Sequence, residues 1–260
     1  MLLGAAALLW FVLASLANRL IFYPIRYPEG DWSAQSRLGA QDRYLTTRDG
    51  VRVHAWWMDQ PGSGLATLFL HGNAGNITHR EYHANEIRAS GSALLLLDYR
   101  GYGKSEGSPS ESGVYADADA AYDFLIQAGY PPKRIVLHGE SLGTAVALDL
   151  ASRRECAGVI LEAPLRSVGA IAAGVVPVLG PLLVRGFDSE RKIGRVGAPL
   201  LIIHGTSDDI VPFSHGQALF AAAREPKWFW AVKGARHNDL VVEAGTAYRT
   251  RLREFYAHLD

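Results

Sequence analysis

The chain has 260 residues, of which 48% are hydrophobic and 20% are charged, so it can bury one large core and is not a disordered chain. Its 26 Lys and Arg balance 26 Asp and Glu, which excludes the dominant basic surface that a nucleic-acid partner requires. The single cysteine, Cys156, excludes an internal disulfide, and no Cys/His cluster has zinc-site spacing, so no metal is expected.

Residues 2–17 are apolar apart from one serine, and the apolar run resumes after Arg19 and stops at Pro24. A membrane-spanning helix needs about 20 apolar residues, and an arginine near one end can extend to the lipid headgroups. Residues 1–23 are therefore predicted to form an uncleaved N-terminal membrane anchor, and residues 24–42 a connecting segment.

Two alternatives to the anchor remain open. Residues 15–17 offer the small side chains of a signal-peptide cleavage site, which would lead to export, although no Lys or Arg precedes the apolar run. The segment could also be an ordinary buried helix. Arg19 and Arg26 follow the apolar run, so the positive-inside rule favours a catalytic domain in the cytoplasm.

Residues 43–260 show short β-rich runs that alternate with longer helical stretches. The predicted strands are residues 43–47, 51–58, 66–70, 93–97, 134–138, 158–161, 199–204 and 227–232, and the predicted helices are residues 77–89, 113–128, 142–153, 213–224 and 238–259. Asp49 and Gly50 predict an antiparallel hairpin between the first two strands. The later runs are almost wholly apolar, which is typical of parallel strands buried on both faces.

This alternation predicts an α/β domain with a mostly parallel eight-stranded sheet, helices on both faces and ligands at the carboxyl ends of the strands. Residues 167–184 interrupt the alternation, because they contain no charge but three Gly and two Pro. We predict that they form two short helices in a small hydrophobic cap over the site. A buried core helix with irregular ends is the alternative.

Residues 139–143 read GESLG and lie between a predicted strand and a predicted helix. Glycines two positions before and after a serine allow the sharp turn that holds its hydroxyl above a sheet in a strained conformation. Ser141 is therefore the candidate nucleophile. A serine that only caps the helix would not explain glycine on both sides.

A serine hydroxyl is a poor nucleophile near neutral pH, so it needs a neighbouring general base, and that base needs an orienting acceptor. Among the nine histidines, His237 is the one that lies in a loop after a strand and downstream of both candidate partners. His138 and His204 lie in or at the ends of strands, where we expect core histidines that bond to the backbone. His237 is the candidate base.

The candidate orienting acid comes from residues 204–212, which read HGTSDDIVP and follow the penultimate strand. We predict that Asp208 orients His237, and that Asp209 forms a salt bridge or caps the next helix. Asp239 is a third candidate, but its closeness to His237 in sequence makes it a poor orienter.

Attack on a carbonyl builds negative charge on its oxygen, which each backbone N–H of an oxyanion hole stabilises by about 2.7–4 kcal/mol. The N–H of Leu142 follows the nucleophile and is one expected donor. The second is expected from residues 71–75, HGNAG, whose glycines allow close backbone approach, and we nominate the N–H of Asn73.

With these motifs the chain resembles an α/β-hydrolase. Within that superfamily it is similar to membrane-anchored hydrolase-domain proteins, which include protein depalmitoylases. The resemblance covers residues 24–258 and rests on HGNAG at 71–75, DYRGYGKSEG at 98–107, GESLG at 139–143, HGTSDDIVP at 204–212 and RHND at 236–239. It implies a triad of Ser141, Asp208 and His237, in the chain order found in α/β-hydrolases. It also implies that Asp98 and Arg100 tie loops together. Depalmitoylating relatives carry an acylated, cysteine-rich amino terminus, which this chain lacks because no cysteine precedes Cys156.

The site residues predict a serine hydrolase that cleaves a carboxylic ester or thioester through an acyl-enzyme, with a small-molecule or lipid acyl-ester substrate. The hydrophobic cap and the predicted anchor favour a lipophilic acyl group. No P-loop or G-x-G-x-x-G motif follows a strand, so no cofactor is expected. Glu140 and Glu162 leave open a peptidase that binds a substrate ammonium, and an anchored scaffold without activity is the other alternative.

Overall fold

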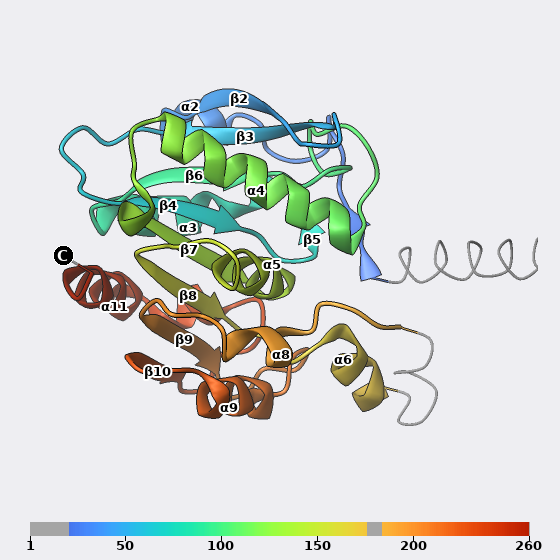
Figure 1. Cartoon of the computed structure of the whole chain (residues 1–260), viewed down its shortest axis with the longest axis vertical. Coiled ribbons are helices and arrows are strands. Elements are labelled where there is room, and N and C mark those ends of the chain that lie inside the picture. The colour runs from blue at the N-terminus through green and yellow to red at the C-terminus, as the bar shows by residue number, and fades with distance from the viewer. Residues whose placement is uncertain (1–20, 176–183, 260) are drawn as a thin grey trace, which may run out of the picture.

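The computed structural model describes residues 21–175 and 184–259, and an eight-stranded sheet runs through its centre (Figure 1). The strand order is β10-β9-β8-β7-β4-β6-β3-β2. These strands are β2 Gln41–Thr46, β3 Arg52–Met58, β4 Ala66–Leu70, β6 Ala93–Leu97, β7 Ile135–Glu140, β8 Gly158–Glu162, β9 Leu200–Gly205 and β10 Lys227–Val232. Strand β3 runs antiparallel to β2 and β6, and the other pairs are parallel. The predicted fold class is thereby confirmed, including the first hairpin.

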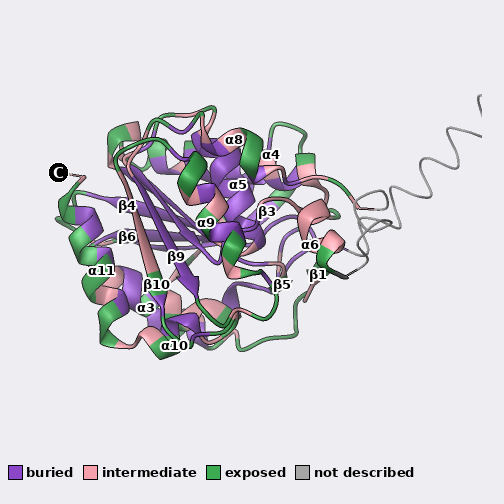
Figure 2. Ribbon diagram, turned by 90° about the horizontal axis from the view of Figure 1, so that it is seen from below, coloured by how far each residue is buried: buried purple, intermediate pink, exposed green. Residues whose placement is uncertain are grey.

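Helices cover both faces of the sheet, and the six inner strands between them are largely buried (Figure 2). One face packs against α4 Glu111–Gln127, α5 Leu142–Ala151, α8 Ser189–Ile193 and α9 Phe213–Ala222, and the other against α2 Ala34–Leu38, α3 Glu81–Ala89, α10 Leu240–Ala244 and α11 Thr246–Ala257. Strand side chains alternate between these two cores: Leu68 and Leu70 belong to the first and Phe69 to the second. This two-sided burial is why the strand sequences are almost continuously apolar.

The predicted helix over residues 238–259 is wrong in one respect, because the structure has two helices there. Gly245 has φ +54 and separates α10 from α11. Its N–H closes α10 by donating to the carbonyls of Val241 and Val242, each at 3.1 Å. A backbone with positive φ cannot continue a right-handed helix, and glycine adopts that conformation without a Cβ penalty. Similarly, residues 77–89 begin as the 3₁₀ turn η1 Ile77–Arg80 before α3.

The predicted anchor lies almost entirely outside the described residues, since the description begins at Ile21. Within the described part of the chain, no helix has the length and apolar character needed to cross a bilayer. The predicted connecting segment, residues 24–42, packs on the domain. Strand β1 (Tyr23–Pro24) pairs with β5 (Ala74–Gly75), and the Asn76 amide donates to the carbonyls of Ile25 and Glu29 at 3.2 and 3.1 Å.

One helix of the predicted cap is described, α6 Val168–Val175. It lies beyond the carboxyl ends of the strands (Figure 1). The remainder of that prediction, residues 176–183, lies outside the described residues. Side chains of α6 line a cavity together with residues that follow β4, β7, β9 and β10, as expected at the edge where a parallel sheet presents its loops.

Candidate active site

Ser141 lies on a tight turn between β7 and α5, with φ +50, a backbone conformation that is strained for a residue with a side chain. The flanking glycines are required by close packing. A Cβ on Gly143 would overlap the carbonyl oxygen of Leu70, and a Cβ on Gly139 would overlap the backbone of Gly143. The N–H of Ser141 donates to the carbonyl of Glu162 at 2.8 Å, which fixes the turn to β8.

The structure brings together the three residues proposed from sequence as a triad. The imidazole Nε2 of His237 lies 3.0 Å from the hydroxyl Oγ of Ser141, and its Nδ1 lies 2.8 Å from Oδ2 of Asp208. These distances are within hydrogen-bonding range for a general base and its orienting acceptor. Each residue follows a strand: Ser141 follows β7, Asp208 follows β9 and His237 follows β10.

Asp208 is held by several donors, and its side chain is fully buried. Its Oδ1 accepts from the backbone N–H groups of Ile210 and Val211 at 2.9 and 2.7 Å. Although burial raises the pKa of this carboxyl, hydrogen bonds from His204 and His237 outweigh burial and keep the pKa well below its ordinary value. Asp208 is therefore ionised at neutral pH.

The two alternative acids lie elsewhere. Asp209 is exposed on the surface, and helix α9, which follows it, has Pro212 rather than Asp209 at its N-cap. Asp239 accepts the backbone N–H of Arg236 at 2.6 Å. Of the three carboxylates, Asp208 is the one whose oxygen lies within hydrogen-bonding distance of the His237 imidazole.

The interpretation of the two core histidines is half right. His204 is buried and its Nε2 lies 3.0 Å from the carbonyl of Val211, as expected for a histidine bonded to backbone. His138 is also buried, but its Nε2 lies 2.5 Å from Oε1 of Glu162. The expectation of a backbone partner for His138 is wrong, because Glu162 lies two residues beyond Ile160, the register partner of His138 in strand β8, and so shares the same face of the sheet.

The nominated oxyanion donors belong to the same cavity as the nucleophile. A cavity of about 340 Å³, here called the acyl cavity, is lined by Asn73, Ser141, Leu142 and His237 together with side chains from α6 and from the loop after β9. The amide Oδ1 of Asn73 accepts from the N–H of Tyr23 and the hydroxyl of Tyr102, both at 3.2 Å. These contacts of the Asn73 side chain hold the loop in place. The backbone N–H of Asn73 is the group proposed to face a substrate.

Glu140 and Arg80 form an ion pair beside Ser141 that the sequence analysis missed. Arg80 Nε lies 2.5 Å from Oε2 of Glu140, which also accepts the N–H of Gly72 at 3.2 Å. Glu140 thereby connects the turn that carries Ser141 to the loop that carries Asn73. The sequence places Glu140 next to the candidate nucleophile, but nothing in the sequence pairs it with Arg80, which lies 60 positions away.

Glu162 also has polar partners. It is buried, and its carboxylate lies within hydrogen-bonding distance of His83, His138 and the hydroxyl of Tyr248. Both carboxylates considered as ligands for a peptide ammonium therefore already have cationic or hydrogen-bonding partners. Across residues 21–175 and 184–259, no three His, Cys, Asp or Glu side chains are grouped in a way that could hold a metal ion.

The loop residues Asp98 and Arg100 occupy buried positions away from the acyl cavity. Asp98 accepts the backbone N–H of Ile77 at 3.0 Å. Arg100 bonds Asp49 of the first hairpin and Asp117 of α4, with shortest distances of 2.7 and 2.8 Å. Both therefore tie separate segments together, as the family resemblance implies.

The Glu140 ion pair predicts a specific dependence of stability on pH. Although burial raises the pKa of Glu140, the charges of Arg80 and His83 lower it to about 2, below the ordinary 4.5. A carboxyl with a depressed pKa stabilises the fold above its unfolded pKa and loses that stabilisation as the pH falls through its folded pKa. Between about pH 6 and about pH 3, Glu140 alone is expected to account for about 2 kcal/mol of lost stability.

Urea unfolding of the wild type and Glu140→Gln at both pH values measures this contribution. The variant is expected to be less stable at the higher pH and to lose less stability on acidification. An equal loss in the two proteins would contradict the assignment of a depressed pKa to Glu140.

Comparisons with known proteins support the architecture just described. The family described as "Serine aminopeptidase, S33" matches residues 62–189. An uncharacterized protein of Mycobacterium tuberculosis is 40% identical over 258 residues, covering 97% of this chain and 90% of that protein. Alpha/beta hydrolase domain-containing protein 17C of Xenopus tropicalis is 38% identical over 236 residues, covering 88% of this chain and 74% of that protein.

Among solved structures, an esterase of Pyrococcus furiosus superposes with a TM-score of 0.78 at 23% identity, covering 92% of this chain and 98% of that one. An esterase of Exiguobacterium antarcticum gives a TM-score of 0.66 at 17% identity, covering 83% of this chain and 100% of that one. At these identities the likeness concerns the fold.

Proposed function

Because the chain belongs to the α/β-hydrolase superfamily, and within it is related to the alpha/beta hydrolase domain-containing 17 proteins, we propose that it is a serine hydrolase that cleaves carboxylic esters or thioesters. The observation that carries this proposal is the continuous hydrogen-bonded series from Ser141 through His237 to Asp208, with separations of 3.0 and 2.8 Å. A nucleophile, a general base and an acceptor that orients the base are the groups that acyl transfer to a serine requires, and these three residues are proposed for those roles.

In the proposed reaction, Oγ of Ser141 attacks the acyl carbon while Nε2 of His237 takes the hydroxyl proton. Asp208, ionised, holds the Nδ1 proton of His237 and stabilises the imidazolium that forms. The negative charge on the substrate oxygen is met by the N–H groups of Leu142 and Asn73. The bond from the acyl carbon to oxygen or sulfur then breaks, and the leaving group takes the proton from His237. Water activated by His237 hydrolyses the acyl-enzyme and restores Ser141.

The proposed acyl group is lipophilic because the acyl cavity is largely lined by aliphatic side chains. Besides the polar groups near Ser141, its lining includes Ile21, Leu142, Leu165, Val168, Ile171 and Val211. A buried CH₂ group contributes about 0.8 kcal/mol, or roughly a fourfold gain in affinity for each added carbon that fits.

A series of p-nitrophenyl esters tests this preference. We expect kcat/KM to rise roughly fourfold per CH₂ from the acetate until the chain fills the cavity. Ile171→Trp, which fills the cavity from α6, is expected to shorten the preferred chain and to leave hydrolysis of the acetate little changed. Ser141→Ala is the inactive control. Equal rates on all chain lengths in the wild type would contradict a lipophilic acyl substrate.

Adding aminoacyl p-nitroanilides to this series of substrates separates the two alternatives. A peptidase would hydrolyse aminoacyl amides faster than acyl esters, and an inactive scaffold would hydrolyse neither. The partnered states of Glu140 and Glu162 speak against the peptidase, since a substrate ammonium would have to displace Arg80 or His83. The catalytic apparatus proposed here lies wholly within residues 43–260.

A further inference from the structure

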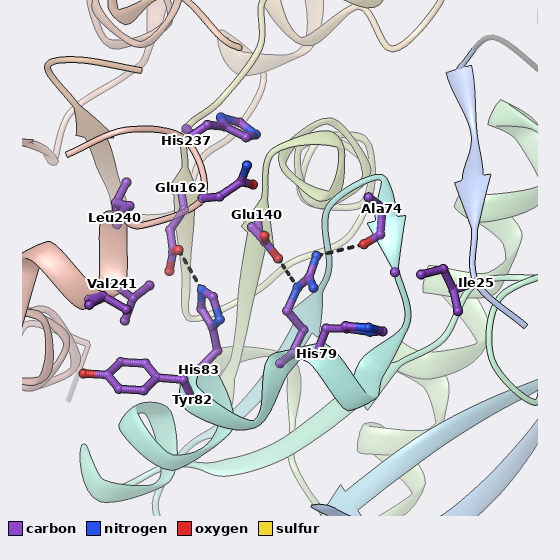
Figure 3. A pocket seen from close by; sticks show the side chains of 15 residues that line it. Ile25, Ala74, His79, Tyr82, His83, Glu140, Glu162, His237, Leu240 and Val241 are labelled. Carbon is purple, nitrogen blue, oxygen red and sulfur yellow. Dashed lines mark hydrogen bonds and ion pairs between the residues drawn. The ribbon is translucent and has the colours of Figure 1, made fainter. Parts of the chain in front are cut away.

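A second cavity, of about 400 Å³, adjoins the acyl cavity, and Figure 3 shows the side chains that line it. The two cavities share Ala74, Arg80, Glu140, His237 and Asn238, but Ser141 and Leu142 line only the acyl cavity. His237 therefore stands between them. We call the second one the α10 cavity, because Leu240, Val241 and Val242 of helix α10 line it.

The position of His237 decides which part of a substrate each cavity can take. In acyl transfer the imidazole delivers its proton to the departing oxygen or sulfur, so the leaving group must lie against the base. The acyl chain instead extends from the carbon bonded to Ser141. A cavity that contains His237 but excludes Ser141 and its oxyanion donor thus lies on the leaving-group side.

The lining of the α10 cavity indicates the chemistry of that group. One end is formed by Tyr82, Leu240 and Val241 (Figure 3). Tyr82 and Val242 are 45% and 65% exposed, which is unusual for large apolar side chains and leaves them available to a bound molecule.

The charged groups of the α10 cavity are already paired. Arg80 lies 2.5 Å from Glu140, and His83 lies 3.2 Å from Glu162. Apart from His79, whose Nδ1 accepts the N–H of Asn76 at 3.2 Å, no described side chain of this lining that can carry a positive charge lacks a carboxylate partner. An anionic leaving group would also approach two carboxylates, so the charge balance disfavours it.

We propose that the α10 cavity is the leaving-group site of the hydrolase and that it binds a bulky, uncharged alcohol or thiol. Its volume exceeds that of the acyl cavity, and both lie in the range of small-molecule sites, so the leaving group is a substantial part of the substrate. This inference rests on the proposed function and adds to it the second half of the substrate.

The two steps of the reaction give the proposal a distinctive kinetic signature. The α10 cavity is occupied while the acyl–oxygen or acyl–sulfur bond breaks and the proton passes from His237 to the leaving group. It has lost that occupant when water attacks the acyl-enzyme. A change in this cavity should therefore alter acylation according to the leaving group and leave deacylation unchanged.

Hexanoate esters of three alcohols test the proposal: ethanol, naphthylmethanol and carboxylated naphthylmethanol. We expect the wild type to prefer the naphthylmethyl ester over the ethyl ester by about tenfold in kcat/KM, and to hydrolyse the anionic ester several-fold more slowly than its neutral counterpart. Val242→Trp, a substitution at an exposed position, is expected to abolish most of the naphthylmethyl preference. Tyr82→Ala is a second variant, which removes an aromatic side chain from the lining of the same cavity and should weaken the same preference.

Ile171→Trp is the matched control, because it fills the acyl cavity and should change chain-length preference without changing leaving-group preference. Burst kinetics with p-nitrophenyl hexanoate give the deacylation rate, which should be the same in Val242→Trp and the wild type. Equal leaving-group selectivity in the wild type, Val242→Trp and Tyr82→Ala would overturn the inference and leave the proposed function standing. No ester hydrolysis by the wild type would overturn both.

Discussion

Replacing Ser141 by alanine is expected to lower kcat/KM for ester hydrolysis by a factor on the order of 10⁵, with little change in stability. The substitution removes the hydroxyl that lies 3.0 Å from Nε2 of His237. Residual hydrolysis would come from water held near the oxyanion donors. A φ of +50 is strained for every residue that has a side chain. Alanine at this position therefore carries the same backbone strain as serine.

Ser214→Ala is the matched control for this variant, because Ser214 is an exposed serine on α9. It should retain wild-type kinetics on the same p-nitrophenyl ester. If Ser141→Ala kept more than about a tenth of the wild-type activity while folded, a covalent role for Ser141 would be untenable.

Asp208→Asn is expected to lower kcat by about 10³ to 10⁴. An asparagine Oδ1 can still accept the N–H groups of Ile210 and Val211, so the loop after β9 should keep its conformation. The amide can no longer stabilise an imidazolium, however, and it favours the wrong tautomer of His237. The fold should therefore survive while proton transfer from Ser141 fails.

Asp209→Asn supplies a stringent control, since it makes the same chemical change at the neighbouring, exposed residue. Its kcat is expected to stay within about twofold of the wild type. Thermal unfolding of both variants checks that neither is simply destabilised. A large loss in Asp209→Asn together with a small loss in Asp208→Asn would reverse the assignment of the orienting acid.

The sequence was sufficient to predict those features that rest on local steric requirements. GESLG between an apolar run and a helical stretch predicts the turn at Ser141, because a Cβ at Gly139 or Gly143 would overlap backbone atoms. The apolar strand runs predict a sheet buried on both sides, since each of the six inner strands, β3, β4, β6, β7, β8 and β9, contributes to both cores. The direction of the first hairpin follows in the same way from Asp49 and Gly50.

Features that rest on contacts between distant segments could not be predicted. The pairs Arg80–Glu140 and His138–Glu162 depend on strand register and on the placement of α3, neither of which a single sequence specifies. The break at Gly245 was missed because the apolar periodicity continues across it, and one glycine within a helical pattern does not by itself end a helix. The α10 cavity likewise arises from side chains of segments far apart in the chain.

The central claim is that His237 makes the hydroxyl of Ser141 a nucleophile, and covalent labelling tests it most directly. The folded chain is treated with a fluorophosphonate, digested, and the modified residue is located by mass spectrometry. We predict one phosphonyl adduct, on Ser141, formed at a rate that falls by at least about a thousandfold in His237→Ala. An adduct on a different residue, or labelling of Ser141 at the same rate without His237, would contradict the account.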